Sequence, residues 1–269
     1  KEMDNHGMIC VGCGAPGFSH EGAVDVLVGG KPGRRAARAV HSTARGPSCG
    51  GTRMYPDPTP DAALSDALRL SKGMSYKNAI ADLPLGGGKA VILGNPLADK
   101  SDAKFAAYAQ AINTLGGRYV TAMDVGILPP DMPVIARGTK FIAGFDQPGK
   151  ANGDSGPATS LGVFLGLKSA VKHRLGVDTT KGLRVAIQGL GKVGMGVARR
   201  LHAEGARLIV ADTNLKAVGE AVETLGAVAA TPDQIVTVEC DVLSPNALGA
   251  GFNDQSIPRL SARVVAGGA

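Results

Sequence analysis

The sequence predicts an α/β protein of two domains, of which the second is a doubly wound parallel sheet. At about 150 residues per domain, 269 residues are enough for two domains. The second half alternates apolar strands with helices, which is the pattern of parallel sheets. Between the halves, Phe145–Ala158 is rich in Gly, Pro, Asp and Asn, and we interpret it as a hinge. We therefore expect an N-terminal α/β domain over 1–145 and a C-terminal domain over 146–269.

The first half begins with a predicted hairpin. Ala23–Val28 and Ala36–His41 alternate loosely around a glycine-rich turn, as antiparallel strands do. A helix is expected to begin at Pro60, after the capping residue Thr59. It places Leu64, Ala67, Leu68 and Ser71 on one face. The further predicted elements of this half are the strand Ala90–Leu93, the helix Asp102–Leu115, with Phe105, Ala109, Ile112 and Leu115 on one face, and the strand Arg118–Ala122.

The second half opens with a largely apolar helix, Thr159–Leu175, and continues in a regular β-α-β rhythm. Strands that alternate with helices in this way argue for a doubly wound sheet. The predicted elements are the strand Leu183–Gln188, the helix Lys192–Glu204, the strand Arg207–Ala211, the helix Leu215–Leu225, and the strands Asp241–Leu243 and Arg263–Ala266.

Composition excludes several classes of protein. Hydrophobic residues make up 44% and charged residues 19% of the chain, as in ordinary globular proteins. The net charge is +6, but the basic residues are dispersed and lack interleaved aromatic residues, so we expect no nucleic-acid partner. No run of about 18 apolar residues predicts a membrane span. Because no basic-then-apolar leader opens the sequence, we expect a cytoplasmic protein.

The four cysteines form no dense framework, which fits a reducing compartment. Cys10 and Cys13 form a CxxC with His6 and His20 nearby. This pair could be a zinc or redox site, or two small residues at a turn. A zinc ribbon needs a second CxxC, which is missing, so we expect no metal.

A dinucleotide fingerprint stands at the start of the second sheet. Gly189, Gly191 and Gly194 form a GxGxxG that follows an apolar strand and opens a helix, and Asp212 closes the next strand about 20 residues on. Glycines there permit a tight turn and a close approach of the backbone to a pyrophosphate. The Asp212 carboxylate can accept ribose hydroxyls and would repel a 2′-phosphate. We therefore expect NAD rather than NADP, against the alternative of a glycine-rich turn that binds nothing.

Reactive residues gather in the first half. Lys89 follows the triplet Gly86–Gly88, Asp124 follows a predicted strand, and Lys77 lies in Gly-Met-Ser-Tyr-Lys. A glycine-rich backbone suggests close approach by a ligand, and a desolvated lysine is a usable base. A neighbouring carboxylate would complete a proton-transfer pair. Spacing alone does not exclude that each lysine is a solvated surface charge.

These motifs, in this order, resemble the leucine, valine and phenylalanine dehydrogenases within the wider glutamate dehydrogenase superfamily. The resemblance covers roughly residues 36–269. It rests on Gly46-Pro47, Gly50-Gly51-Thr52-Arg53-Met54, Gly73-Met74-Ser75-Tyr76-Lys77, Gly86-Gly87-Gly88-Lys89-Ala90-Val91-Ile92, Asp124-Val125-Gly126, Gly189–Gly194, Glu239-Cys240-Asp241, Ala247-Leu248-Gly249 and Val265-Ala266-Gly267.

The resemblance implies NAD-dependent oxidative deamination of an apolar L-amino acid to its 2-oxo acid and ammonia, by a homo-oligomer. Lys89 would activate the attacking water and bond the developing carbonyl oxygen, and Asp124 would exchange protons with the substrate nitrogen. Lys77 would hold the substrate carboxylate, in a pocket lined by Gly50, Gly51 and Met74. The residues implied to bind the cofactor are Gly189, Gly191, Lys192, Val193, Gly194, Asp212, Thr159 and Asn246.

Some positions depart from the family pattern. Leucine-type enzymes usually carry Glu where Met123 stands and Leu where Cys49 stands, and Asn246 replaces a usual Cys. Family members continue past Gly267 with two asparagines and helices that return to the first domain, a segment absent from this sequence. Met123, and the likeness of Thr159–Gly166 to the tryptophan dehydrogenase branch, leave an aromatic substrate open. A further alternative is a non-catalytic NAD-binding relative.

Overall fold

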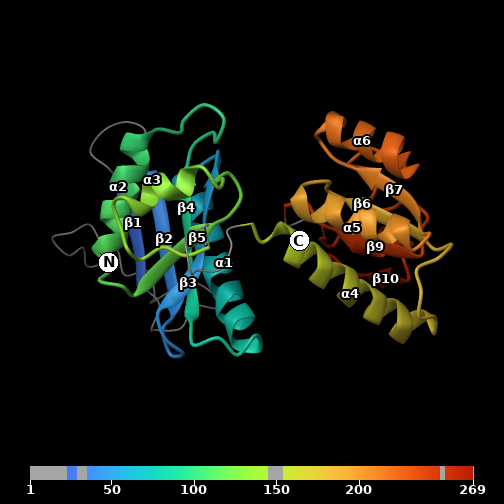
Figure 1. Ribbon diagram of the computed structural model, residues 1–269, viewed down its shortest axis with the longest axis horizontal. Coiled ribbons are helices and arrows are strands. Elements are labelled where there is room, and N and C mark those ends of the chain that lie inside the picture. Colours follow the sequence, from blue (N-terminus) through green and yellow to red (C-terminus); the bar gives the residue numbers. More distant parts are fainter. Residues whose placement is uncertain (1–22, 29–34, 145–153, 249–251, 269) are drawn as a thin grey trace. The chain divides into compact units, whose positions relative to one another are not determined.

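The structure is a computed structural model that describes residues 23–28, 35–144, 154–248 and 252–268. The chain divides into two compact units, Lys1–Asp154 and Ser155–Ala269, each with its own hydrophobic core (Figure 1). Most of the predicted hinge lies outside the described residues. Its last part, Gly156–Ala158, is not a linker but the first turn of a helix, because Pro157 suits a helix N-terminus.

The first unit contains a five-stranded sheet in the order β1-β2-β4-β3-β5. β1 pairs with β2 and β2 with β4 in antiparallel fashion, whereas β3 is parallel to both β4 and β5. The predicted hairpin is confirmed, with Val26 opposite Ala37. The elements are β1 (Ala23–Val28), β2 (Arg35–Ser42), β3 (Ser48–Tyr55), α1 (Pro60–Ile80), β4 (Gly86–Leu93), α2 (Asp102–Asn113), β5 (Tyr119–Met123) and α3 (Asp131–Ala136).

Helices cover both faces of this sheet (Figure 1). α1 begins as predicted, since the Thr59 hydroxyl accepts a hydrogen bond from the Ala62 N–H at 3.1 Å. A buried stripe of small and polar residues lets α1 pack closely on β2 and β4. α2 and α3 pack on the opposite face, where the predicted apolar face of α2 lies in the core. The stripe on α1 consists of Ala63, Ala67, Ser71 and Asn78.

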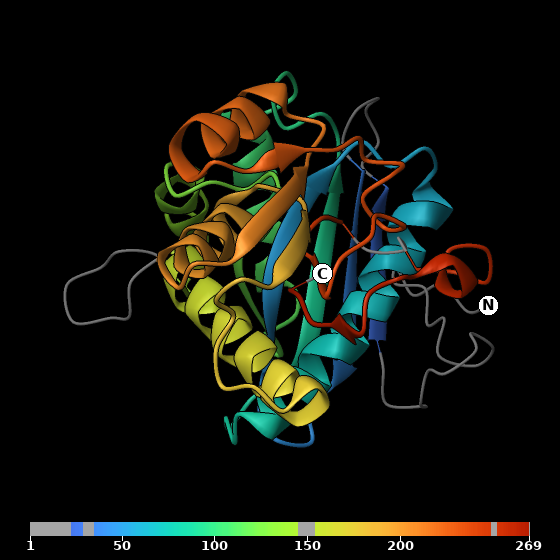
Figure 2. The ribbon, with the colours of Figure 1, turned by 90° about the vertical axis from the view of Figure 1, so that its right-hand side faces the viewer.

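The second unit is the predicted doubly wound sheet. Its strands are parallel and run in the order β10-β9-β6-β7-β8, so the strand order reverses at β6: β7 and β8 are added on one side of it, and β9 and β10 on the other. α4, α5 and α6 lie along one face, and the other is covered by irregular segments (Figure 2). The elements are α4 (Gly156–Leu175), β6 (Arg184–Gln188), α5 (Lys192–Ala203), β7 (Arg207–Ala211), α6 (Leu215–Leu225), β8 (Val228–Ala229), β9 (Val242–Pro245), the short 3₁₀ helix η1 (Ile257–Arg259) and β10 (Val264–Val265).

The sequence patterns do not predict β3, although it lies between β4 and β5 and positions most of the site described below. In the part of the chain that the structure describes, no helix has the length and apolar character needed to cross a membrane.

Candidate active site

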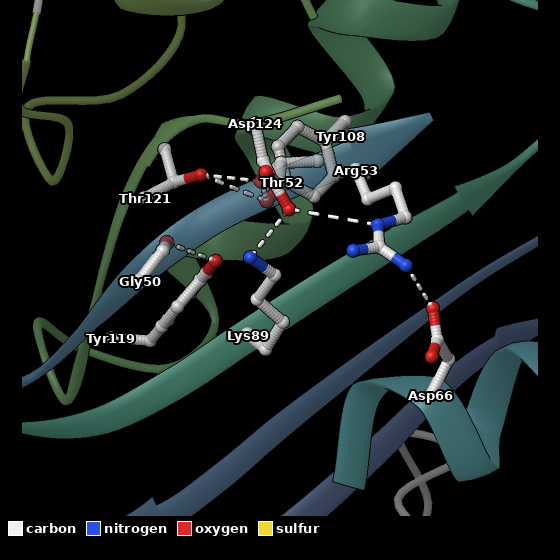
Figure 3. Close-up of polar contacts among 9 residues, drawn as sticks. All are labelled: Gly50, Thr52, Arg53, Asp66, Lys89, Tyr108, Tyr119, Thr121 and Asp124. Carbon is white, nitrogen blue, oxygen red and sulfur yellow. Dashed lines mark hydrogen bonds and ion pairs between the residues drawn. The ribbon is translucent and has the colours of Figure 1, made fainter. Parts of the chain in front are cut away.

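Charged side chains gather on the α1 face of the first sheet, over β3, β4 and β5 (Figure 3). Alternation along the strands directs Arg53 on β3 and Lys89 on β4 to this face, while Thr52 and Ala90 point to the core under α2. α1 packs mainly on β2 and β4 and contacts β3 only slightly. Polar groups can therefore collect over β3 and β5 without displacing the helix.

Lys89 and Asp124 form a close ion pair at the centre of this group. The Lys89 Nζ lies 2.5 Å from Asp124 Oδ2 (Figure 3). The Lys89 side chain is 8% exposed and that of Asp124 is 23% exposed. A charge-assisted contact of this kind offsets part of the cost of removing two charges from water. The structure thus brings together the two residues that the resemblance assigns to proton transfer.

Their surroundings shift both pKa values downwards. Burial is the main cause of the lowered pKa of Lys89; the charges of Arg53 and Lys77 act in the same direction, and Asp124 opposes them. Burial alone would raise the pKa of Asp124, but Lys89, the Val125 N–H and Arg53 outweigh it and leave this pKa below its usual range. A lysine with a lowered pKa can lose its proton during a reaction, and Asp124 is ionised at neutral pH.

Arg53 links this pair to α1. Its Nη1 lies 2.5 Å from Asp66 Oδ2, and its Nε lies 3.6 Å from Asp124 Oδ2 (Figure 3). Sequence reasoning assigns no role to Arg53 or Asp66. The available signal is weak: Asp66 flanks the buried stripe of α1, where a carboxylate needs a cation as partner.

The triplet Gly86–Gly88 serves packing within the protein. A Cβ at Gly87 would collide with Ser75 of α1, and one at Gly88 would come within 2.6 Å of the Tyr119 ring. Only glycine therefore lets α1 and β5 approach β4 as they do. Packing of the chain accounts for this triplet without the close approach of a ligand that its sequence suggests.

Gly50 and Gly51 pack tightly against neighbouring parts of the first unit. A Cβ at Gly50 would collide with the carbonyl of Gly88 and lie 3.1 Å from Met74 Cγ, and one at Gly51 would lie 2.7 Å from Asp124 Cβ. Gly51 thus lies against Asp124, and Gly50 lies between Met74 and the residue before Lys89, where both glycines leave room for the neighbouring chain.

Lys77 lies exposed in the last turn of α1, near enough to Lys89 for its charge to lower the pKa of Lys89. The end of α1 that carries Lys77 is held against the sheet by the next residue, Asn78, which is buried. The Asn78 amide donates hydrogen bonds to the carbonyl oxygens of Gly86, at 2.6 Å, and Cys49, at 3.4 Å. Lys77 therefore offers a solvated ammonium group beside a buried ion pair.

Hydroxyl groups support β3 and β5 from the opposite face of the sheet. Thr52 bonds to Tyr108 and, at 2.5 Å, to Thr121, while Tyr119 donates to the Gly50 carbonyl at 2.9 Å (Figure 3). Burial raises the pKa of both tyrosines, so the phenols keep their protons and can donate. These bonds fix the strands that carry Arg53 and Asp124.

In the second unit, the glycine fingerprint forms the turn between β6 and α5. Gly189 has φ of +89°, a conformation that favours glycine. A Cβ at Gly194 would collide with the Gly189 carbonyl, whereas one at Gly191 would meet no atom of the described residues within 4 Å. Among the residues that the structure describes, no side chain caps the N-terminus of α5. An open backbone at an uncapped helix N-terminus fits a pyrophosphate, and Lys192 and Val193 form the first turn.

Asp212 follows β7 beside this turn. Its Oδ2 accepts a hydrogen bond from the Leu190 N–H at 2.5 Å, and its Oδ1 accepts one from the Asn214 N–H at 2.7 Å. Each carboxylate oxygen can accept a second hydrogen bond. The carboxylate can therefore fix the turn and still accept ribose hydroxyls, so these residues fit a dinucleotide.

Asn246 follows β9, across the reversal point from the fingerprint. Its side chain bonds to Ser244 and accepts the Gly268 N–H at 3.1 Å, so it ties β9 to the end of β10. Carboxyl ends of strands at such a reversal point are where doubly wound sheets bind ligands. Thr159 lies exposed in the first turn of α4.

The departures from the family pattern have distinct surroundings. Met123 packs against the core under α2. Cys49 is half-buried, and burial raises the pKa of its thiol. Cys10 and Cys13 lie outside the described residues. Among the residues that are described, no group of three or more His, Cys, Asp and Glu side chains could hold a metal ion.

Comparisons with known proteins match both units. Residues 24–141 match the model of the Glu/Leu/Phe/Val dehydrogenase dimerisation domain, and residues 153–218 match that of the Glutamate/Leucine/Phenylalanine/Valine dehydrogenase domain. Leucine dehydrogenase of Bacillus cereus is 48% identical over 237 residues, which cover 88% of this chain and 65% of that protein. The chain thus spans about two thirds of its curated relative.

Two solved structures of amino acid dehydrogenases are also similar to this chain. The crystal structure of L-tryptophan dehydrogenase from Nostoc punctiforme matches with a TM-score of 0.66 and 41% identity, over 91% of this chain and 70% of that one. A hetero-hexameric glutamate dehydrogenase from Thermus thermophilus matches with a TM-score of 0.70 and 26% identity, over 87% of this chain and 62% of that one.

The fold is therefore that of the two-domain amino acid dehydrogenases, with a mixed sheet in one unit and a doubly wound parallel sheet in the other. The chain belongs to the Glu/Leu/Phe/Val dehydrogenase family.

Proposed function

We propose that this protein oxidatively and reversibly deaminates an apolar L-amino acid of the leucine, valine or isoleucine type, with NAD as cofactor. The observation that carries the proposal is the buried pair of Lys89 and Asp124 in a family of amino acid dehydrogenases. The products would be the 2-oxo acid and ammonia.

Binding of the substrate uses its two charged ends. Lys77 offers an exposed ammonium group for the substrate carboxylate, and Gly50, Gly51 and Met74 are the further residues proposed to line the substrate pocket. Asp124 is ionised at neutral pH and attracts the substrate ammonium. A cation and an anion at opposite ends of the site favour an amino acid over a plain amine or a plain acid.

Proton transfers fall to Lys89 and Asp124. Asp124 takes a proton from the substrate ammonium, and Lys89, with its lowered pKa, removes a proton from the water that adds to the imine carbon. The protonated Lys89 then bonds the developing oxygen. NAD, when bound, supplies the acceptor for the hydride that leaves Cα.

The turn from Gly189 to Gly194 would hold the cofactor, with Lys192 and Val193 in the first turn of α5 and Asp212 at the adenosine ribose. Asn246 and Thr159 are further proposed contacts. Because the Asp212 carboxylate would repel a 2′-phosphate, we expect the kcat/KM of the reaction to be much higher with NAD than with NADP.

Relatives support the choice of substrate and the assembly. The substrate class follows leucine dehydrogenase, at 48% identity. An aromatic substrate is the second candidate, because L-tryptophan dehydrogenase is 41% identical and shares the fold. A homo-oligomer is proposed because the first unit matches a dimerisation domain. We propose a cytoplasmic location, because the four cysteines form no dense framework, which fits a reducing compartment.

The proposal is tested by a panel of L-amino acids with NAD or NADP at alkaline pH, followed by NADH or NADPH absorbance. We expect the highest kcat/KM for leucine, valine or isoleucine with NAD. A preference for phenylalanine or tryptophan would select the second candidate. A protein that binds NAD in calorimetry but turns over no amino acid would instead be a non-catalytic relative.

A further inference from the structure

Arg53 carries a buried charge close to the proposed catalytic pair. Its side chain is 15% exposed, and its Nη1 is held by Asp66 of α1 at 2.5 Å. Its Nε is buried and makes no hydrogen bond to the residues that the structure describes. That Nε lies 3.6 Å from Asp124 Oδ2, the same oxygen that contacts Lys89 Nζ (Figure 3).

We propose that Arg53 is a positioning residue, which holds the Asp124 carboxylate in place when Lys89 leaves it during turnover. The inference rests on the proposed function, in which Lys89 takes a proton from the attacking water and then, as the protonated lysine, turns to the substrate oxygen. At that moment Asp124 would lose its contact with the Lys89 ammonium group. The guanidinium group of Arg53 is then the positive charge that remains beside the Asp124 carboxylate.

The chemistry of the guanidinium group suits this role. Arginine stays protonated at every working pH, and its planar group can hold two carboxylates at once. A hydrogen bond requires about 2.7–3.2 Å between nitrogen and oxygen. The Arg53 Nε therefore needs to move by roughly half an ångström to bond Asp124, while Nη1 stays with Asp66.

Charged groups from several elements surround Arg53. Asp57 lies in the loop after β3, Asp66 on α1, Lys89 on β4 and Asp124 after β5. Burial and the Asp66 charge raise the pKa of Asp57, and Arg53 opposes this rise. Arg53 thus lies among three carboxylates, of which only Asp124 belongs to the proposed catalytic pair.

The test compares Arg53→Gln and Arg53→Lys with the control Arg45→Gln. Arg45 forms an Arg–Asp pair of 2.6 Å with Asp82 in the same unit, but that pair is exposed. The first readout is the pKa of the Asp124 carboxyl by carbon-13 NMR titration, assigned with Asp124→Asn. The second is the pH profile of kcat with L-leucine and NAD. Thermal melting shows whether each variant folds.

Arg53→Gln should raise the pKa of Asp124 by about one unit, the low end for loss of a nearby opposite charge. It should lower kcat by about tenfold or more. It should also shift the rising limb of the profile, which reports loss of the Lys89 proton, to higher pH, because the Arg53 charge lowers the pKa of Lys89. Arg53→Lys keeps the charge, so the pKa of Asp124 should stay near the wild-type value. Its kcat should recover only in part, because a single ammonium cannot hold both carboxylates. Arg45→Gln should change neither readout.

An unchanged pKa of Asp124 in Arg53→Gln would overturn the inference, as would a loss of kcat that is equal at every pH. If Arg53→Gln does not fold, Asp66→Asn, which removes the partner that holds Arg53, provides the test. In this variant kcat should fall while the pKa of Asp124 does not rise. A full wild-type kcat would contradict the role of Asp66 in holding Arg53. An inactive wild type would contradict the proposed function itself, whereas these outcomes in an active enzyme concern Arg53 alone.

Discussion

Asp124 is the residue on which the proposed turnover depends most directly, because it faces both Lys89 and the expected substrate nitrogen. Asp124→Asn keeps the shape of the side chain and removes the base. We expect kcat to fall by about 10²–10⁴, the usual contribution of a positioned acid–base group. The Kd for NAD, measured by calorimetry, should stay the same because the fingerprint lies in the other unit. Near-normal turnover in this variant would rule out the proposed mechanism.

Lys89 predicts the direction of the pH dependence. Its pKa lies below the value of an exposed lysine, mainly because it is buried. As pH rises through this lowered pKa, Lys89 becomes the free base and kcat should increase. Between the folded-state pKa and the unfolded-state value of about 10.4, the unfolded chain binds more protons, so stability should also rise with pH.

The measurement is log kcat against pH for the wild type and for Lys89→Arg, which keeps the charge but does not titrate in this range. The wild type should show a rising limb, and Lys89→Arg should show little turnover at any pH. A wild-type profile that is flat over the alkaline range would contradict the assignment of Lys89 as the base.

At the scale of elements, two glycines at the turn into α5 differ in the space around them. A Cβ at Gly194 would collide with the Gly189 carbonyl, whereas one at Gly191 would enter open space. Gly194→Ala should therefore destabilise the second unit by about 1–3 kcal/mol, as overpacking does. Gly191→Ala should leave the melting temperature unchanged and raise the Kd for NAD by about tenfold or more, since its methyl group would occupy the approach of the pyrophosphate.

Calorimetric titration with NAD and thermal melting of both variants provide the comparison. Equal losses of stability in the two variants would mean that both glycines serve packing. Unchanged NAD affinity in Gly191→Ala would remove this turn from the proposed cofactor site.

The elements also show how much of this structure the sequence patterns predict. Elements such as α1, α6 and β7 begin or end where their patterns indicate. β3 escapes prediction because Gly50 and Gly51 have poor strand propensity, and its place depends on contacts with β4 and Asp124. Asp66 and Arg53 meet only through the packing of α1 beside β3. Local patterns carry no information on such contacts.

At the scale of the whole molecule, the fold divides the chemistry between two separately packed units. The first contains the ion pair and the second contains the fingerprint, and each has its own core. We therefore expect residues 155–269, expressed alone, to fold and to bind NAD with a Kd within about tenfold of that of the whole chain. Residues 1–154 alone should not bind NAD.

Circular dichroism and calorimetry of the two fragments test this division, with Gly191→Ala in the shorter fragment as control. A folded fragment 155–269 without NAD affinity would show that cofactor binding needs the first unit as well.

The ion pair of Lys89 and Asp124 also has a consequence for how the first unit is made. A ribosome completes β4 well before it adds Asp124, so Lys89 waits for its partner while the chain is still being synthesised. An uncompensated charge in a folded interior costs several kcal/mol. β4 therefore gains little from taking its final place between β2 and β3 until β5 has arrived. This ordering favours a nascent chain that stays open until β5 is available, and then closes its sheet and assembles its reactive pair in one cooperative step.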